Sequence, residues 1–307
     1  TTLFRSANQL VQDKVDILHT IGGDDTNTTA SELAQYLSQA GHKLIVVGLP
    51  KTIDNDIYPI VQTLGAWTAA EQGAVFFENI ANENTTSTRQ LIIHEVMGRH
   101  CGWLTAATAQ VYRNRLETKE FLPELLIDKN RWDIDAIYIP ELAIDFEQEV
   151  ERLTKRMDEK DGVNIFLSEG AGIGTIVEEM EREGKEIPRD AFGHVRLDEM
   201  NPGQWFASQF SERLGAKKTL VQKSGYFARS AAPNEKDLTL IKQSAKLGAE
   251  CALAGQNGVV GMDQEKEDEI SLIDFNRIKG GKPFDTNAYW FTDLLNQIGQ
   301  PLGDLHK

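Results

Sequence analysis

Two short apolar runs constrain the fold of this chain more than any other feature. Residues 17–21 (ILHTI) stop at Gly22-Gly23, and residues 44–49 (LIVVGL) stop at Pro50. Apolar runs of this length, cut off by glycine or proline, are typical of buried strands in a parallel sheet. Parallel strands joined by a helix end on the same edge of their sheet, where open α/β sheets bind ligands. The residues that follow each run are therefore expected to share a site.

The segment between these runs predicts one helix. Thr29 and Glu32 have the spacing of a capping box, small and apolar residues recur at helical spacing from Leu33 to Ala40, and Gly41 provides a stop. The predicted order of strand, helix and strand is the βαβ unit from which doubly wound domains are built.

The two strand ends carry residues suited to phosphoryl transfer. Gly-Gly-Asp-Asp-Thr follows the first at 22–26, and Pro-Lys-Thr-Ile-Asp-Asn-Asp follows the second at 50–56. Two glycines let a backbone approach a phosphate, four acidic residues can bind Mg²⁺ or accept a proton, and Lys51 supplies a cation. An isolated Asp-Asn-Asp would suit an ordinary turn, but that interpretation leaves Lys51-Thr52 and the Gly-Gly-Asp-Asp turn unexplained.

Four motifs, taken together, resemble those of the phosphofructokinase family. They are GGDDT at 22–26, PKTIDND at 50–56, MGRHCGW at 97–103 and GYFARS at 225–230. A Gly-Gly-Asp turn alone is a weak signal because other kinase families share it, whereas the set in this order is specific. Within the family, the sequence is similar to the pyrophosphate-dependent branch.

The resemblance implies two doubly wound, Rossmann-like α/β domains with the active site in the cleft between them. Residues 1–63 with about 231–307 are expected to form the phosphoryl-donor domain, and residues 64–230 the fructose-6-phosphate domain. Residues 1–12 read as a helix that leads directly into the first strand, whereas relatives begin with a further strand and a glycine-rich turn. The donor domain is therefore expected to lack its N-terminal segment.

The activity that the resemblance implies is a Mg²⁺-dependent, reversible phosphoryl transfer of glycolysis and gluconeogenesis. Pyrophosphate would phosphorylate the 1-hydroxyl of fructose 6-phosphate, giving fructose 1,6-bisphosphate and phosphate. Two alternatives remain open at this point. One is an ATP-dependent 6-phosphofructokinase, and the other is a catalytically silent regulatory subunit that binds a sugar phosphate.

The first two motifs carry the family's donor residues. Asp54 matches the catalytic base, and Asp24 matches the Mg²⁺ ligand. The remaining expected residues are Thr52 and Asp56 beside the base, and Gly23, Asp25 and Lys51 at the pyrophosphate. ATP-dependent relatives have glycine at the positions of Asp25 and Lys51, so a carboxylate and an ammonium there favour the shorter donor.

The second half of the chain carries the family's acceptor residues. Arg99 is expected near the reacting phosphoryl oxygens as well as at the sugar. The other expected contacts to fructose 6-phosphate are Met97, Gly98, Glu169, Tyr226, Arg229, Lys223 and Arg89. Spacing does not choose among Lys217, Lys218 and Lys223, and Lys223 is favoured. Arg89 lies one position from the family's intersubunit arginine, which implies a homo-oligomer, most simply a homodimer.

Composition excludes other classes of function. A net charge of −15 over 307 residues argues against nucleic acid, whose binding depends on neutralised phosphates. The two cysteines, Cys101 and Cys251, have no metal-binding spacing, and no apolar run approaches the roughly 18 residues of a membrane span. A cytoplasmic enzyme with no membrane partner is expected. His94 is interpreted as a hydrogen-bonded core residue. Residues 277–283 (RIKGGKP) are interpreted as a surface turn, with a phosphate contact as the open alternative.

Overall fold

The computed structural model describes residues 2–189 and 195–305. The chain divides into two compact units, Thr1–Thr68 with Ala232–Lys282, and Ala69–Ala231 with Pro283–Lys307. This division differs from the expected domains at the end of the chain, because residues 283–307 group with the second unit. The reason is apolar packing, since Phe291 and Leu294 are buried in the same core cluster as Ala106 and Tyr112 of the second unit.

The first unit is built on a four-stranded sheet of order β1-β2-β7-β8 in the part of the chain that the structure describes. The first three strands are parallel and β8 is antiparallel to β7. Its elements are β1 (Ile17–Gly22), β2 (Ile45–Pro50), β7 (Gly258–Asp263), β8 (Glu269–Ile273), α1 (Thr2–Gln12), α2 (Asp24–Gln39), α11 (Glu235–Leu253), and the 3₁₀ turns η3 (Gln264–Lys266) and η4 (Phe275–Arg277).

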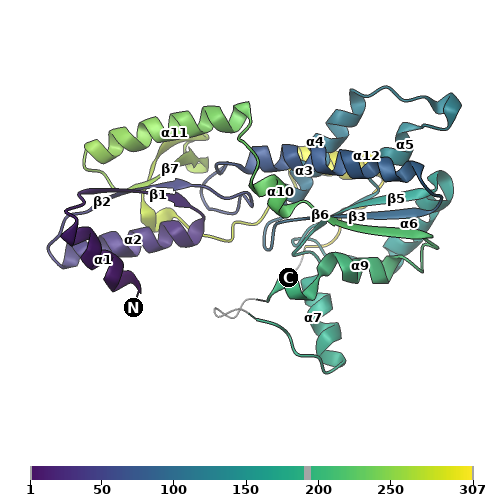
Figure 1. The fold of residues 1–307 in the computed structure, drawn as a ribbon, viewed down its shortest axis with the longest axis horizontal. Helices are drawn as coiled ribbons and strands as arrows, with labels where there is room; N and C mark the ends of the chain where they lie inside the picture. Colours follow the sequence, from purple (N-terminus) through teal and green to yellow (C-terminus); the bar gives the residue numbers. More distant parts are fainter. Residues whose placement is uncertain (1, 190–194, 306–307) are drawn as a thin grey trace. The chain divides into compact units, whose positions relative to one another are not determined.

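Helices cover both faces of this first sheet, with α2 on one side and α11 on the other (Figure 1). Strand β2 is buried along its whole length, and its side chains alternate between the two faces. Val46 packs with Leu33 and Leu37 of α2, whereas Val47 packs with Leu240 of α11. The continuous apolar run in the sequence is thus explained by a strand buried on both faces.

The second unit contains a parallel four-stranded sheet of order β4-β5-β3-β6, again counted within the described residues. Helix α3 (Ala66–Ala81) leads into it from the first unit. The other elements are η1 (Asn82–Thr85), β3 (Gln90–Val96), α4 (Trp103–Glu117), η2 (Pro123–Leu125), α5 (Lys129–Trp132), β4 (Ala136–Tyr138), α6 (Phe146–Lys160), β5 (Gly162–Ser168), α7 (Ile173–Arg182), α8 (Leu197–Met200), α9 (Pro202–Phe210), β6 (Lys218–Lys223), α10 (Gly225–Arg229) and α12 (Tyr289–Ile298).

Two apolar clusters hold this second sheet between layers of helices. One joins α3, α4 and α12 to residues such as Ile92 and Phe166, and the other joins α6 and α9 to the neighbouring positions Leu91 and Ile93. The alternation follows from the two-residue period of a strand. None of the described helices is both long and apolar enough to span a membrane.

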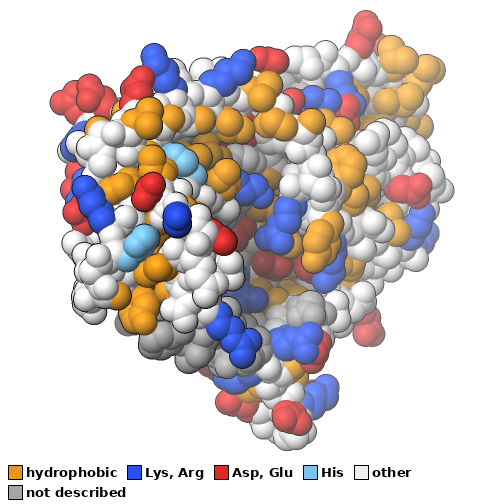
Figure 2. Space-filling model, turned by 60° about the vertical axis from the view of Figure 1, so that its left-hand side comes forward, with side chains coloured by type: hydrophobic (Ala, Val, Ile, Leu, Met, Phe, Trp, Pro, Cys, Tyr) orange, Lys and Arg blue, Asp and Glu red, His pale blue; other side chains and the backbone are white. Residues whose placement is uncertain are grey.

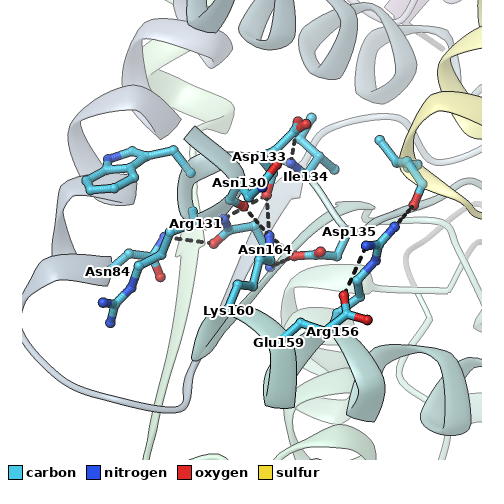
Figure 3. A network of polar contacts seen from close by, with 12 residues as sticks. Asn84, Asn130, Arg131, Asp133, Ile134, Asp135, Arg156, Glu159, Lys160 and Asn164 are labelled. Atoms are coloured by element: carbon cyan, nitrogen blue, oxygen red, sulfur yellow. Dashed lines mark hydrogen bonds and ion pairs between the residues drawn. The ribbon is translucent and has the colours of Figure 1, made fainter. Parts of the chain in front are cut away.

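A polar network closes the amino end of the second sheet (Figure 3). Asn164, buried in β5, donates through Nδ2 to the carbonyls of Arg131 at 3.2 Å and Asp133 at 3.0 Å. The ammonium of Lys160 lies 2.9 Å from the Asp135 carboxylate, and both side chains are largely buried. Burial raises the pKa of the Asp135 carboxyl, and the Lys160 ammonium opposes that rise. The network therefore includes a buried ion pair.

His94 lies in the middle of β3 and is fully buried among aromatic rings. Its ring stacks on Phe77 at 5.3 Å between centroids and meets the edge of Phe166 at 4.9 Å. The expectation of a core residue holds, but within the described residues neither ring nitrogen has a hydrogen-bond partner. Burial alone lowers the pKa of His94 to about 3, so the imidazole stays neutral in the folded chain.

We expect His94 to make the protein sensitive to mild acid. The unfolded chain takes up this proton near the ordinary pKa of 6.5 and the folded chain only near 3, so stability falls as pH drops below 6.5. The loss is about 1.4 kcal/mol per pH unit, or about 2 kcal/mol at pH 5. His94→Phe keeps the ring stacking and should flatten this part of the profile in chemical denaturation at pH 7 and pH 5. An unchanged difference between the two pH values would contradict the assignment.

Lys160→Met should destabilise the second unit, because it leaves the Asp135 carboxylate buried without its cation. Breaking a buried ion pair from one side typically costs about 3–5 kcal/mol. Lys155→Met is the matched control, since Lys155 and its partner Glu151 are exposed on the same helix. Thermal denaturation should show a clear loss for Lys160→Met and an unchanged midpoint for Lys155→Met. Equal midpoints for the two variants would show that the buried pair contributes nothing.

Candidate active site

The site on the first unit begins where β1 turns directly into α2. Gly23 is the residue before the helix, which starts at Asp24. The capping box predicted at Thr29 and Glu32 is wrong, because both residues lie inside α2. The physical reason is that the Gly-Gly turn already reverses the chain, and the acidic residues of the motif occupy the first helical turn, where the helix dipole favours them. The unpaired N–H groups of this helix end consequently lie beside the turn, as in known anion sites.

Asn55 organises the loop that follows β2. It is buried in the left-handed region with φ of 56°, and its Oδ1 accepts the backbone N–H of Thr63 at 2.9 Å. The Thr63 hydroxyl donates to the Thr52 carbonyl at 2.7 Å, and the Thr52 hydroxyl accepts the Asp54 N–H at 3.2 Å. Backbone bonding also ties the two motifs together, since the Lys51 N–H donates to the Gly22 carbonyl at 2.8 Å. The central asparagine of Asp-Asn-Asp is therefore structural.

Three carboxylates gather at this edge of the first sheet. Burial raises the pKa of Asp56 to about 6, and the nearby carboxylates of Asp54 and Asp24 add to the rise. The ammonium of Lys282 opposes it. Like charges at close range disfavour one another's ionised form, so the first-unit edge holds a local excess of negative charge that a cation would relieve.

The carboxylates at this edge suit Mg²⁺ better than they suit a metal ion whose ligands all come from the protein. Among residues 2–189 and 195–305, no group of three or more His, Cys, Asp or Glu side chains is arranged to hold a metal ion. Mg²⁺ typically takes only one or two carboxylates and fills its other positions with water and substrate phosphates. Asp24, at the start of α2 and half-buried, can supply such a carboxylate.

The sequence analysis missed one contributor to this edge. Residues 277–283 were interpreted as a surface turn, but the Lys282 N–H donates to the Asp56 carbonyl at 2.8 Å, and Gly280 lies against the Asp24 carboxylate. The only signal in the sequence was the basic, glycine-rich composition of this segment, which does not by itself indicate where the segment folds.

The second unit gathers polar residues at the carboxyl edge of its own sheet, where β3 and β5 end side by side. Glu169 follows β5, and its carboxylate accepts the Gly98 N–H at 3.3 Å. Gly98 has φ of 135°, and a Cβ there would lie 2.5 Å from the Cys101 carbonyl oxygen, so only glycine fits. Burial raises the pKa of the Glu169 carboxyl, the Gly98 N–H and the cations of Arg99 and Arg229 lower it, and the Glu95 carboxylate adds to the rise.

Helix α10 and the end of β6 complete this second-unit edge. Tyr226 and Arg229 are exposed on α10, and the Met97 side chain packs on Gly225. Lys223 forms an ion pair of 2.9 Å with Glu95, which is 6% exposed and also accepts the Gly203 N–H. Glu95 was not predicted, because a charged residue within an apolar strand gave no sign of its partners.

The register of β3 and β6 decides which of the other predicted cations lie at this carboxyl edge. Gln90 pairs with Lys218 at the amino ends of β3 and β6, whereas Glu95 pairs with Lys223 at their carboxyl ends. Of the three lysines, Lys223 is consequently the one that the register places at the carboxyl edge, beside Glu95. Arg89 lies at the amino end and is not brought together with the other predicted residues. Its guanidinium donates to the Leu214 and Gly215 carbonyls and pairs with Asp158 at 2.7 Å.

Residues 2–252 match the profile of the family described as Phosphofructokinase. The chain belongs to the phosphofructokinase family. It is 57% identical over 298 residues to a protein of Methylomonas methanica named pyrophosphate–fructose 6-phosphate 1-phosphotransferase, covering 97% of this chain and 73% of that protein. A protein of the same name from Propionibacterium freudenreichii subsp. shermanii is 58% identical over 296 residues, covering 96% and 73%.

A solved structure supports the phosphofructokinase fold. The pyrophosphate-dependent phosphofructokinase from Marinobacter aquaeolei superposes with a TM-score of 0.67 at 20% identity, covering 98% of this chain and 72% of that one. The family resemblance and the prediction of Rossmann-like α/β domains are confirmed. The roles of individual site residues stay predictions.

Acidic and basic side chains are mixed over the face drawn in Figure 2. Because the chain carries a net charge of −15, an anionic substrate needs a local group of cations. Arg99, Arg229 and Lys223 form such a group at the second-unit edge, the two arginines near the Glu169 carboxylate and Lys223 paired with Glu95.

Asp56→Asn should stabilise the protein at neutral pH. The folded pKa of Asp56, about 6, lies above its ordinary value of 3.8, so the folded chain binds this proton more tightly and stability falls as pH rises from 4 to 6. Above pH 6 the cost is about 2 kcal/mol after allowance for solvent screening. Denaturation without divalent cations should show the variant more stable at pH 8 and equal to the parent near pH 4. A gain independent of pH would contradict the burial of the Asp56 charge, and its repulsion by neighbouring carboxylates, as the cause.

Proposed function

We propose that this phosphofructokinase-family chain transfers a phosphoryl group from pyrophosphate to the 1-hydroxyl of fructose 6-phosphate, reversibly and with Mg²⁺. The observation that carries the proposal is the pair Asp25 and Lys51, which follow neighbouring strand ends at the first-unit edge. The relatives that share 55–58% of its residues are named for this reaction. The first unit would bind the donor and the second the acceptor.

The choice of donor follows from charge. Asp25 is exposed at the start of α2, and a carboxylate there opposes the α-phosphate of a nucleotide. Two unit charges about 4 Å apart interact by roughly 4 kcal/mol at an effective dielectric near 20, which is enough to change donor preference by orders of magnitude. Lys51, whose side chain passes over Gly65, adds a cation for a donor that has no nucleoside to anchor it.

The proposed chemistry requires one base and several charge-stabilising groups. Asp54 takes the proton of the sugar hydroxyl as the new bond to phosphorus forms. Thr52 donates its hydroxyl to the transferring phosphoryl group, and Asp56 supports the base. Asp24 would hold Mg²⁺, which when bound offsets the negative charge of the diphosphate.

The proposed acceptor site lies at the second-unit edge. Glu169 accepts hydrogen bonds from sugar hydroxyls, and Met97 and Gly98 shape the sugar pocket. Arg229 binds the 6-phosphate through its two-pronged guanidinium, which suits phosphate geometry. The list of contacts is completed by Arg99, Tyr226 and Lys223.

Assembly as a homodimer in the cytoplasm belongs to the proposal and rests on the family resemblance. Arg89 adds little support to a shared site, because its guanidinium already makes contacts within its own chain. A dimer that shares its sites would need another cation from the partner.

The pair Asp25→Gly and Lys51→Gly should reduce use of pyrophosphate and admit ATP, because it removes both the opposing carboxylate and the anchoring cation. Steady-state assays at matched Mg²⁺ compare the two donors. Glu183→Gly with Lys185→Gly is the control, because it removes one exposed charge of each sign elsewhere and should leave donor preference unchanged. A parent protein that already prefers ATP would refute the proposed function.

Asp54→Asn keeps the size of the side chain but cannot accept the hydroxyl proton. The turnover number should fall by roughly 10²–10⁴, whereas KM for fructose 6-phosphate should change little because ground-state binding is retained. A variant within tenfold of the parent would place the base at another residue.

A further inference from the structure

The segment from Ile278 to Lys282 lies along the Asp-Asn-Asp loop. Lys279 and Tyr58 exchange two backbone hydrogen bonds, of 2.8 and 3.0 Å. Three residues later, the Lys282 N–H donates to the Asp56 carbonyl at 2.8 Å. This segment is separated from the loop by more than two hundred residues in the sequence, yet it is bonded to it at both ends.

Two adjacent glycines in this segment suit their positions for different reasons. A Cβ atom on Gly280 would lie 2.0 Å from Oδ2 of Asp24 and 2.8 Å from its Cγ, so the carboxylate occupies the space of a side chain. Gly281 has φ of 72° and nothing within 4 Å of its Cβ position. The backbone conformation of Gly281 thus favours glycine, whereas at Gly280 the Asp24 side chain leaves no space for a Cβ atom.

Lys282 ties the same loop through its side chain. Its ammonium donates to the Ile60 carbonyl, while its backbone N–H is bonded to Asp56. One residue therefore holds the loop on both sides of the Tyr58 pairing. The positive charge also lies close enough to Asp56 to lower its pKa.

We propose that Gly280 and Lys282 are positioning residues of the donor site. Gly280 fixes the orientation of the Asp24 carboxylate, and Lys282 fixes the loop that carries Asp54 and Asp56. The inference rests on the proposed function for the nature of the ligand, a metal–diphosphate complex. It adds a second support to the metal ligand, of the kind whose loss typically weakens metal binding by about 10–100-fold.

The test measures binding rather than turnover. Mn²⁺ is titrated in the presence of imidodiphosphate, a diphosphate that resists transfer, and free Mn²⁺ is followed by electron paramagnetic resonance. Gly280→Ala should weaken Mn²⁺ binding at least about tenfold, with fructose 6-phosphate binding unchanged by calorimetry. Gly281→Ala, which strains the backbone but meets no side chain, should bind Mn²⁺ within about twofold of the parent.

The outcomes separate the two claims. A parent that binds Mn²⁺ and imidodiphosphate, with Gly280→Ala unchanged or Gly281→Ala equally weakened, overturns the positioning role alone. A parent that binds neither overturns the proposed function and this inference with it.

Stability gives an independent check of the Gly280 contact. Gly280→Ala should lower the unfolding midpoint in the parent and lower it much less in an Asp24→Gly background, where the obstructing side chain is gone. Equal losses in both backgrounds would refute the contact with Asp24.

Lys282→Met should lower the turnover number while leaving KM for fructose 6-phosphate unchanged, and Lys282→Arg should restore part of the loss because it can still donate to Ile60. A Lys282→Met variant with parental turnover would remove Lys282 from the proposal.

Discussion

The gathering of Asp24, Asp54 and Asp56 at one edge of the first sheet is the constraint on which the candidate site of this unit depends. Its clearest sign is the pKa of Asp56, raised to about 6 by burial and by the two neighbouring carboxylates. Folding tolerates this arrangement because the surrounding backbone is fixed by other bonds, through Asn55, Thr63 and the segment that ends at Lys282. A bound cation would relieve the negative charge that these carboxylates concentrate at the edge.

In the second unit, the acidic side chains at the carboxyl edge of the sheet lie beside cations and N–H groups that balance their charge. Glu169 and Glu95 lie at the carboxyl edge and are balanced by arginine, lysine and backbone N–H groups. A buried ion pair at the opposite end of the sheet, between Lys160 and Asp135, serves the packing of α6 against β5. The two ends of the second sheet therefore differ. The Lys160 ammonium at the amino end is largely buried, whereas the cations at the carboxyl end are partly exposed, so that an anionic ligand could reach them.

Much of this arrangement could be predicted from the sequence because parallel strands place their ends together. The Gly-Gly-Asp-Asp and Asp-Asn-Asp motifs follow paired strands as expected. The sequence left Lys217, Lys218 and Lys223 open, and the register of β3 and β6 places Lys223 at the carboxyl edge. The local pattern gave the wrong start for α2. The capping box at Thr29 predicts a start near that residue, but the Gly-Gly turn lets the helix begin at Asp24.

Long-range contacts were beyond sequence reasoning. Nothing near Gly280 indicates that Asp24 will occupy the space beside it, and nothing near His94 indicates that its ring nitrogens will lack partners. The destination of residues 283–307 likewise depends on which core the apolar face of α12 meets. Such features are set by tertiary packing, which a single sequence does not encode in its local spacing.

Phosphorus NMR of the reaction mixture tests the central claim most directly. The purified protein, fructose 6-phosphate, pyrophosphate and Mg²⁺ are followed together, with a parallel sample that contains ATP in place of pyrophosphate. The account predicts that the pyrophosphate signal declines while a sugar 1-phosphate signal and inorganic phosphate appear in equal amounts, with the ATP sample unchanged. Consumption of ATP in preference to pyrophosphate, or loss of pyrophosphate with no new sugar phosphate, would contradict it.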